Sequence, residues 1–118
     1  RCGQGVFKSK VRLNEAKCRV TGITDVRFLI ASHIKPWRLC NDQEKLDGAN
    51  GLLLSPHVDR LFDRGFISFE DDGTLICSPS LPREVADKWL PKFAINIGRF
   101  NPKQAAYLAF HRKSIFKS

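Results

Sequence analysis

The 118-residue sequence contains no methionine, one tyrosine and four cysteines. It also has no run approaching the roughly 18 apolar residues that a membrane-spanning helix needs, which excludes helical membrane proteins. Its first residues lack the apolar core of a secretory signal. The cysteines, at positions 2, 18, 40 and 77, form no CxxC pair, so a disulfide framework and a zinc knuckle are both excluded. We expect reduced thiols in a cytoplasmic protein, with Cys18 and Cys77 partly buried.

Repeats and low-complexity segments are also missing, which excludes solenoid and disordered classes. With 42% hydrophobic and 27% charged residues, the composition is that of a globular protein. The length predicts one domain over residues 1–118. Because the chain does not begin with methionine, we expect it to be a fragment of a longer protein or a processed one.

Positive charge is the clearest global feature. Lysine and arginine number 20 against 12 acidic residues, which gives a net charge of +8 and a pI near 9.7. These cations are spread along the chain rather than gathered in a tail. A folded basic domain favours a polyanionic partner, of which nucleic acid is the commonest. The alternative is that the charge serves solubility alone.

Apolar patterning predicts an α+β domain. The central part, residues 27–65, reads as strand, polar loop, strand and helix. Ser55 is expected to cap that helix, with Pro56 in its first turn and Gly65 at its end. The other expected elements are a first helix over 4–16, strands over 27–34 and 52–54, one helical turn near 43–46, a hairpin of 66–70 with 74–77, and helices over 82–90 and 102–116.

Residues 31–65 contain two of the three histidines and predict a hydrolytic site. Hydrolysis of a phosphodiester at neutral pH needs a base, a group that orients the base, and a cation that stabilises developing charge. Histidine is the natural base because its unperturbed pKa is roughly 6.5. His33, then Asn50, then the pair His57 and Asp59 supply these parts in order along the chain.

Four motifs carry a family resemblance, and two more extend it over nearly the whole chain. Together they resemble the HNH endonuclease superfamily, in the branch found as the C-terminal domain of bacterial restriction-type endonucleases. The motifs are Cys18-x-x-Thr21-Gly22, Ala31-Ser32-His33-Ile34-x-Pro36-Trp37, Asn50-Gly51-Leu52-x-Leu54-Ser55-Pro56 and Asp59-x-Leu61-Phe62-Asp63-x-Gly65, with Arg1-x-Gly3-Gln4-Gly5-x-Phe7 at the start and Tyr107-Leu108-x-x-His111-Arg112-x-x-x-Phe116 at the end.

The resemblance implies a ββα-metal core with an added β-hairpin and flanking N- and C-terminal helices. It also implies a metal-dependent endonuclease that cuts double-stranded DNA as the cleavage module of a restriction or defence protein. Specificity would then belong to a recognition domain preceding this chain, and a homodimer is left open. The implied cofactor is a divalent ion, Mg²⁺ or Mn²⁺ first.

Carried over by position, His33 would be the general base and Asn50 would orient it. Family motifs place the last metal-binding residue about nine positions after the asparagine, which points to Asp59. His57 would be a second ligand or a phosphate contact. Asp63, one helical turn after Asp59, either joins the metal site or caps backbone near the helix end.

Ser32 departs from the family pattern, which often has a metal-binding aspartate at that position. A hydroxyl is a much weaker ligand, so the metal must rely on other groups or bind loosely. DNA phosphates would be contacted mainly by basic residues near the motif: Lys35, Arg38, Arg60 and Arg64.

Simpler interpretations stand beside these. Taken alone, His33 would be a structural histidine and Asn50-Gly51 an ordinary turn. Ser32 favours the rival that the chain is a catalytically inactive DNA-binding module of the same fold, and a basic protein-interaction domain is a second rival. We interpret His111 as structural, and Trp37 as packing within the loop rather than stacking on a base.

Overall fold

The computed structural model describes residues 4–118, so the motif positions Arg1 and Gly3, and Cys2, lie outside the described residues. The architecture is α+β, as predicted. In chain order the elements are α1 (Gln4–Val11), η1 (Val26–Phe28), β1 (Ile30–His33), η2 (Trp37–Leu39), α2 (Asp42–Leu46), η3 (Gly48–Asn50), β2 (Gly51–Leu54), α3 (Pro56–Asp63), β3 (Ile67–Phe69), β4 (Leu75–Cys77), α4 (Arg83–Trp89) and α5 (Pro102–Ser114).

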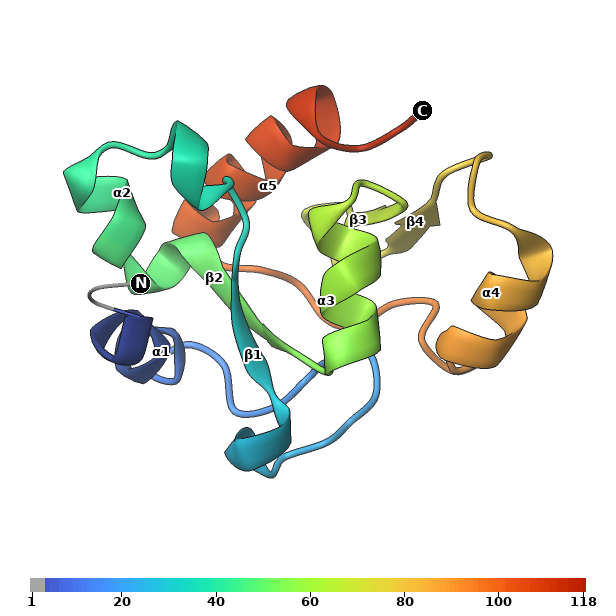
Figure 1. The fold of residues 1–118 in the computed structure, drawn as a ribbon, viewed down its shortest axis with the longest axis horizontal. Helices are drawn as coiled ribbons and strands as arrows, with labels where there is room; N and C mark the ends of the chain where they lie inside the picture. The colour runs from blue at the N-terminus through green and yellow to red at the C-terminus, as the bar shows by residue number, and fades with distance from the viewer. Residues whose placement is uncertain (1–3) are drawn as a thin grey trace.

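A ββα unit occupies the middle of the molecule and confirms the predicted core. Strands β1 and β2 pair antiparallel, with Ile30 opposite Leu54 and His33 opposite Gly51. All residues of β2 are buried, as expected for an apolar strand covered on both faces. Figure 1 shows α1 and α3 on either side of this hairpin, and both helices contact β1.

Helix α3 begins at Pro56, two residues after the end of β2, and ends just before Arg64 and Gly65. Ser55 holds the N-cap position but makes no capping hydrogen bond, so the predicted capping role of its hydroxyl is wrong. That hydroxyl instead shares a 2.7 Å hydrogen bond with Thr21 Oγ1. Gly65 has a φ of 78°, a left-handed conformation that glycine adopts without strain. Val58, Leu61 and Phe62 are the buried residues of α3.

The second hairpin, β3–β4, is joined to the core by α5. His111 of α5 is 1% exposed and stacks on Phe62 with ring centroids 3.9 Å apart. Its Nε2 lies 2.9 Å from the carbonyl oxygen of Phe62, and its Nδ1 lies 2.8 Å from Ser68 Oγ. Since a carbonyl only accepts, Nε2 is the protonated nitrogen and Nδ1 accepts from Ser68. His111 thus holds α3, β3 and α5 together.

Several element boundaries differ from the predictions. The first helix ends at Val11 rather than at residue 16, and Leu13, predicted as one of its apolar members, is 84% exposed in the turn that follows. Glu15 is instead buried, where it pairs with Arg19 at 2.7 Å and accepts a hydrogen bond from Gln104 at 3.0 Å. The last helix ends at Ser114, two residues earlier than predicted.

The first strand also starts later than predicted, because Asp25 caps a 3₁₀ turn over Val26–Phe28. The segment predicted as mostly loop between the strands holds η2, α2 and η3, so only its helical turn near 43–46 was foreseen. Cys18 is buried as expected, whereas Cys77 is exposed, so that part of the cysteine prediction is wrong. None of the helices in residues 4–118 has the length and hydropathy to cross a membrane.

Candidate active site

A cleft of about 360 Å³ opens between the end of β1, the turn that follows it, and α3. Four of the predicted site residues line it: Ser32, His33, Asp59 and Asp63. Arg38, predicted to bind phosphate, lines it as well. The remaining wall is formed by Gln4, Ile30, Ala31, Pro36 and Trp37. His33 precedes Asp59 and Asp63 by 26 and 30 positions in the sequence. The ββα unit therefore brings an imidazole and two distant carboxylates to one cleft.

His33 is the last residue of β1, and its ring is oriented by contacts that include a stack on Phe7 and a hydrogen bond to Lys45. The ring stacks on Phe7 with centroids 3.7 Å apart and planes 3° apart. Nε2 lies 2.8 Å from the backbone carbonyl oxygen of Lys45. Because a carbonyl oxygen only accepts, Nε2 carries the proton and Nδ1 is the basic nitrogen of the neutral ring. The structure thus selects the tautomer in which Nδ1 can take up a proton.

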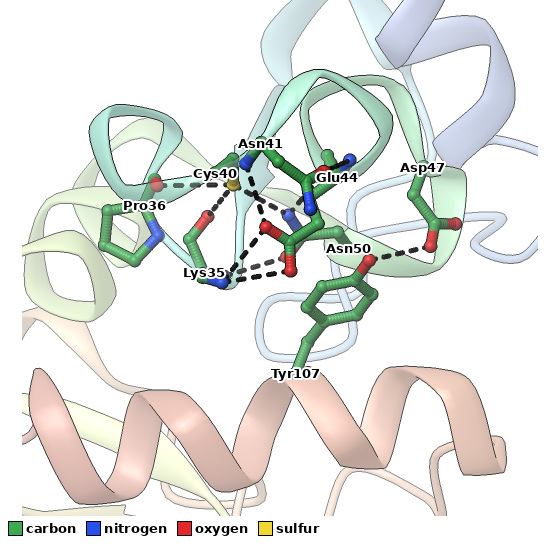
Figure 2. A network of polar contacts seen from close by, with 8 residues as sticks. All are labelled: Lys35, Pro36, Cys40, Asn41, Glu44, Asp47, Asn50 and Tyr107. Carbon is green, nitrogen blue, oxygen red and sulfur yellow. Dashed lines mark hydrogen bonds and ion pairs between the residues drawn. The ribbon is translucent and has the colours of Figure 1, made fainter.

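Asn50 is fully buried and ties together the backbone around His33. Its Oδ1 accepts from the backbone N–H of Lys35 at 2.8 Å, and its Nδ2 donates to the carbonyl oxygen of Glu44 at 3.1 Å. Lys35 is two residues after His33. Glu44 immediately precedes Lys45, whose carbonyl oxygen accepts the hydrogen bond from His33 Nε2. Figure 2 shows the Asn50 amide at the centre of this network. Asn50 can therefore position His33 through the two segments that flank it.

The rest of the network fixes the loop that carries Lys45. The thiol of Cys40 donates to the carbonyls of Lys35 and Pro36, each at 3.3 Å, and burial raises the pKa of this thiol. The Lys35 ammonium pairs with Glu44 at 3.0 Å. Tyr107 reaches up from α5 to donate to Asp47 at 2.8 Å (Figure 2). The loop is thus rigidly attached at both ends of α2.

The two carboxylates lie one helical turn apart on α3. Asp59 is partly buried, and this burial is the main cause that raises its pKa above the usual value. The negative charge of Asp63 raises the pKa of Asp59 further, whereas a hydrogen bond from the Ser32 hydroxyl lowers it. Asp63 is exposed to solvent. Burial and the nearby charge of Asp63 both destabilise the ionised form of Asp59. A bound cation would offset both effects.

The donor set fits a magnesium-like ion. Across residues 4–118, no group of three or more His, Cys, Asp or Glu residues is arranged to hold a metal ion. Mg²⁺ does not require such a cage, because it keeps several waters and is usually held by one or two carboxylates together with substrate phosphates. Asp59 and Asp63 supply hard oxygen donors of this kind. The Ser32 hydroxyl donates a hydrogen bond to Asp59.

Two other predicted site residues lie elsewhere. His57 faces α4, where its ring meets Trp89 edge-on at 6.0 Å, and it is not among the residues that line the cleft. Lys35 is paired with Glu44, and its ammonium lies 5.1 Å from the ring centroid of Phe110, beside a different hollow. Arg60 of α3 and Arg64, the C-cap residue of that helix, are exposed and lie next in sequence to the two cleft carboxylates.

Sequence reasoning missed the roles of Phe7 and Lys45, which both contact the His33 ring. Phe7 belongs to the predicted first helix and to the N-terminal motif of the family resemblance, but neither observation links its ring to His33. Lys45 acts through its backbone carbonyl, which every residue has, so its identity carries no signal. Trp37 lines the cleft, and its ring centroid lies 4.3 Å from the Lys45 ammonium.

Comparison with known proteins identifies one family. A family model described as HNH endonuclease matches residues 18–70, which include β1, β2, α3 and β3. The chain has no match among curated proteins. The matched segment contains every predicted catalytic and metal-binding residue, from Ser32 to Asp63.

Proposed function

Through residues 18–70 the chain belongs to the HNH endonuclease superfamily, and we propose that it is a metal-dependent endonuclease domain that hydrolyses phosphodiester bonds in double-stranded DNA. The single observation that carries this proposal is the shared cleft of His33 and Asp59. A base and a cation-binding carboxylate on the same hollow leave room between them for a scissile phosphate.

His33 acts as the general base in the proposed reaction. Its Nδ1 takes a proton from water as the water oxygen attacks phosphorus, and the bond from phosphorus to the 3′ oxygen breaks. The departing oxygen takes a proton from solvent, which leaves 3′-hydroxyl and 5′-phosphate ends. The hydrogen bond from Nε2 to the Lys45 carbonyl stabilises the imidazolium that forms.

Asp59 would hold the divalent ion, with Asp63 as a second oxygen donor. When bound, such an ion supplies positive charge near the phosphate and the departing oxygen. Mg²⁺ and Mn²⁺ are the proposed ions. Asn50 keeps the His33 segment in place by its bonds to Lys35 and Glu44.

Phosphate contacts are proposed for three arginines around the cleft. Arg38 lines it directly, while Arg60 lies on the helix of Asp59 and Asp63, and Arg64 is the C-cap residue of that helix. The ion pair of Lys35 with Glu44 leaves that residue a weaker candidate. Contacts of this kind give affinity that depends on salt and not on sequence.

The wider setting remains as predicted from the resemblance. We propose a cleavage module of a restriction or defence protein, with recognition in a separate N-terminal domain. A single domain over residues 1–118, a cytoplasmic location and a homodimer stay predictions.

A plasmid-cleavage assay tests the proposal. The wild-type chain should nick or linearise supercoiled DNA with Mg²⁺ or Mn²⁺ and lose this activity in EDTA. His33→Ala should abolish cleavage and leave folding and DNA binding intact. His57→Ala is the matched control, since it removes a histidine of α3 that lies outside the cleft. Metal-dependent cleavage by His33→Ala, or none by the wild-type chain, would refute the proposal.

A further inference from the structure

We propose that Phe7 is a positioning residue for His33, which makes helix α1 part of the catalytic unit. The inference rests on the proposed role of His33 as the base, and it goes beyond the matched segment, which begins at residue 18. Three sets of contacts carry it: the ring stack, the space left by Gly51, and the attachment of α1 to β1.

The stack restrains the imidazole in a direction that its hydrogen bond does not. Phe7 is 1% exposed, and its ring lies 3.7 Å from that of His33 with the planes 3° apart. Contact over a whole face prevents the imidazole from tilting out of its plane. The bond from Nε2 to the Lys45 carbonyl, 2.8 Å long, opposes rotation within that plane. The two contacts together hold Nδ1 in one direction.

Gly51 makes the stack possible. It is the cross-strand partner of His33, and its backbone is extended, with a φ of −155° and a ψ of 155°. Any residue can adopt this conformation, so backbone freedom is not the reason for glycine here. A Cβ at Gly51 would lie 2.7 Å from Cζ of Phe7 and would also overlap Val11. The missing side chain therefore provides the space that the Phe7 ring fills.

Helix α1 is attached to the strand that carries His33, so Phe7 and His33 move as one body. Lys8 Nζ donates to the carbonyls of Val26 and Leu29 at 2.9 and 2.8 Å, just before β1. Gln4 Nε2 donates to the carbonyl of Ala31 within β1 at 3.4 Å. The stack is thus set by the docking of a whole helix and not by one flexible side chain.

A positioning role and a purely structural role predict different results. A core phenylalanine supports stability, and its loss lowers the fraction of folded enzyme without changing turnover by the molecules that remain folded. A positioning residue changes turnover itself, because a misplacement of about 1 Å can cost on the order of a hundredfold in rate. The tautomer of His33 adds a readout that does not depend on activity.

The experiment uses Phe7→Leu and Gly51→Ala in the full chain. Leucine keeps an apolar side chain but removes the ring, whereas alanine at position 51 adds a Cβ that overlaps the edge of the Phe7 ring and Val11. The controls are Val11→Ala, which removes a fully buried group from the same helix, and Gly5→Ala, whose new Cβ meets nothing within 4 Å. Each variant is checked for folding by thermal melting before kinetics.

We expect Phe7→Leu and Gly51→Ala to lower kcat at least about tenfold with KM nearly unchanged. Both controls should keep the wild-type kcat when folded. Ring-nitrogen NMR should show a single Nε2-protonated His33 in the wild-type chain, and a mixture of tautomers in the two test variants. Phe7→Leu removes the ring and Gly51→Ala crowds it, so either one tests the inference if the other does not fold.

Unchanged kcat and an unchanged tautomer in a folded test variant would overturn the inference and leave the nuclease proposal standing. An equal loss of kcat in Val11→Ala would overturn it as well, because general loosening of α1 would then suffice. If the wild-type chain cleaves no DNA, the nuclease proposal fails. The tautomer comparison then decides alone whether Phe7 holds the ring of His33.

Discussion

The side-chain amide of Asn50 donates to the backbone carbonyl of Glu44 at 3.1 Å, immediately before the residue whose carbonyl binds His33. The same amide accepts from the backbone of Lys35 on the other side of the loop. One buried side chain thus joins the turn after β1, the strand that ends at His33, to helix α2, whose Lys45 carbonyl binds the His33 ring. An asparagine can do this because it has a donor and an acceptor on one short, rigid group.

Substitution of Asn50 should separate its two roles. Asn50→Asp keeps an acceptor for Lys35 but loses the donor toward Glu44, whereas Asn50→Ala loses both. We expect Asn50→Ala to lower the free energy of unfolding by about 2 kcal/mol, since it leaves buried backbone groups without partners. Both variants should lower kcat. Urea unfolding and plasmid cleavage measure these effects, and full activity in a folded Asn50→Asp would count against a role for the Glu44 bond.

Asp59→Asn should separate activity from stability. The carboxylate of Asp59 is partly buried with a raised pKa, so its charge is costly in the folded protein without a cation. An amide of the same shape removes that cost and can still bond to Ser32. We expect a melting temperature equal to or above wild type, and loss of cleavage at all Mg²⁺ concentrations.

Asp63→Asn is the matched comparison, since Asp63 lines the same cleft but is exposed. It should retain cleavage at raised Mg²⁺ concentration, in line with a secondary role in holding the ion. A titration of cleavage rate against Mg²⁺ distinguishes the two variants. Normal cleavage by Asp59→Asn would remove this carboxylate from the metal site.

Arginine substitutions should change the salt dependence of DNA binding. Arg60→Ala and Arg64→Ala each remove an exposed cation next in sequence to a carboxylate of the cleft. Each should weaken binding equally on unrelated sequences and reduce the slope of log K against log salt by about one. Lys35→Gln serves as the comparison, because its ion pair with Glu44 predicts a smaller change. Fluorescence anisotropy at several salt concentrations gives the slopes, and unchanged slopes in both arginine variants would place the DNA elsewhere.

His111 should make the protein less stable in mild acid. Burial lowers its pKa to about 4, although the Phe62 carbonyl and Asp63 act in the opposite direction. In the unfolded chain the ordinary pKa is about 6.5, so below that pH the unfolded state binds a proton that the folded state does not. The free energy of unfolding should therefore fall by roughly 3 kcal/mol between pH 6.5 and pH 4. Urea unfolding at a series of pH values measures this loss.

His111→Gln is the control for that loss. Glutamine can still donate to the Phe62 carbonyl but does not titrate, so the variant should be less stable at pH 7 and less sensitive to acid. The carboxyl groups of Asp25, Glu44 and Asp72 have lowered pKa values and contribute only at the acid end of the range. Equal pH dependence in wild type and variant would mean that His111 is not the group responsible.

The ββα unit was predictable because its signals are local. An apolar strand ends at His33, a second apolar strand leads into Ser55-Pro56, and a glycine ends the helix that follows. The errors have a different origin, because they depend on tertiary contacts. Helix α1 stops at Val11, and Glu15, which was predicted to lie within it, is buried against Arg19 and Gln104. Cys77 is exposed on β4, which among the described strands pairs with β3 alone.

The site was predictable only in part. Motif order pointed to His33 and Asp59, and the structure brings both to one cleft. The sequence left two roles open for His57, a second metal ligand or a phosphate contact. Residues two positions apart on a helix point in directions about 200° apart, so His57 and Asp59 face away from each other. Placing Asp59 in the cleft therefore turns His57 toward Trp89.

By itself, the sequence determined the positive charge, the order of strand, strand and helix, and the residue types available for chemistry. These follow from composition and from short-range periodicity. The tertiary structure alone decided which nitrogen of His33 carries the proton and what holds its ring. Those properties depend on a backbone carbonyl and on a phenyl ring from a distant helix, and contacts between segments far apart in the chain leave no pattern in either segment.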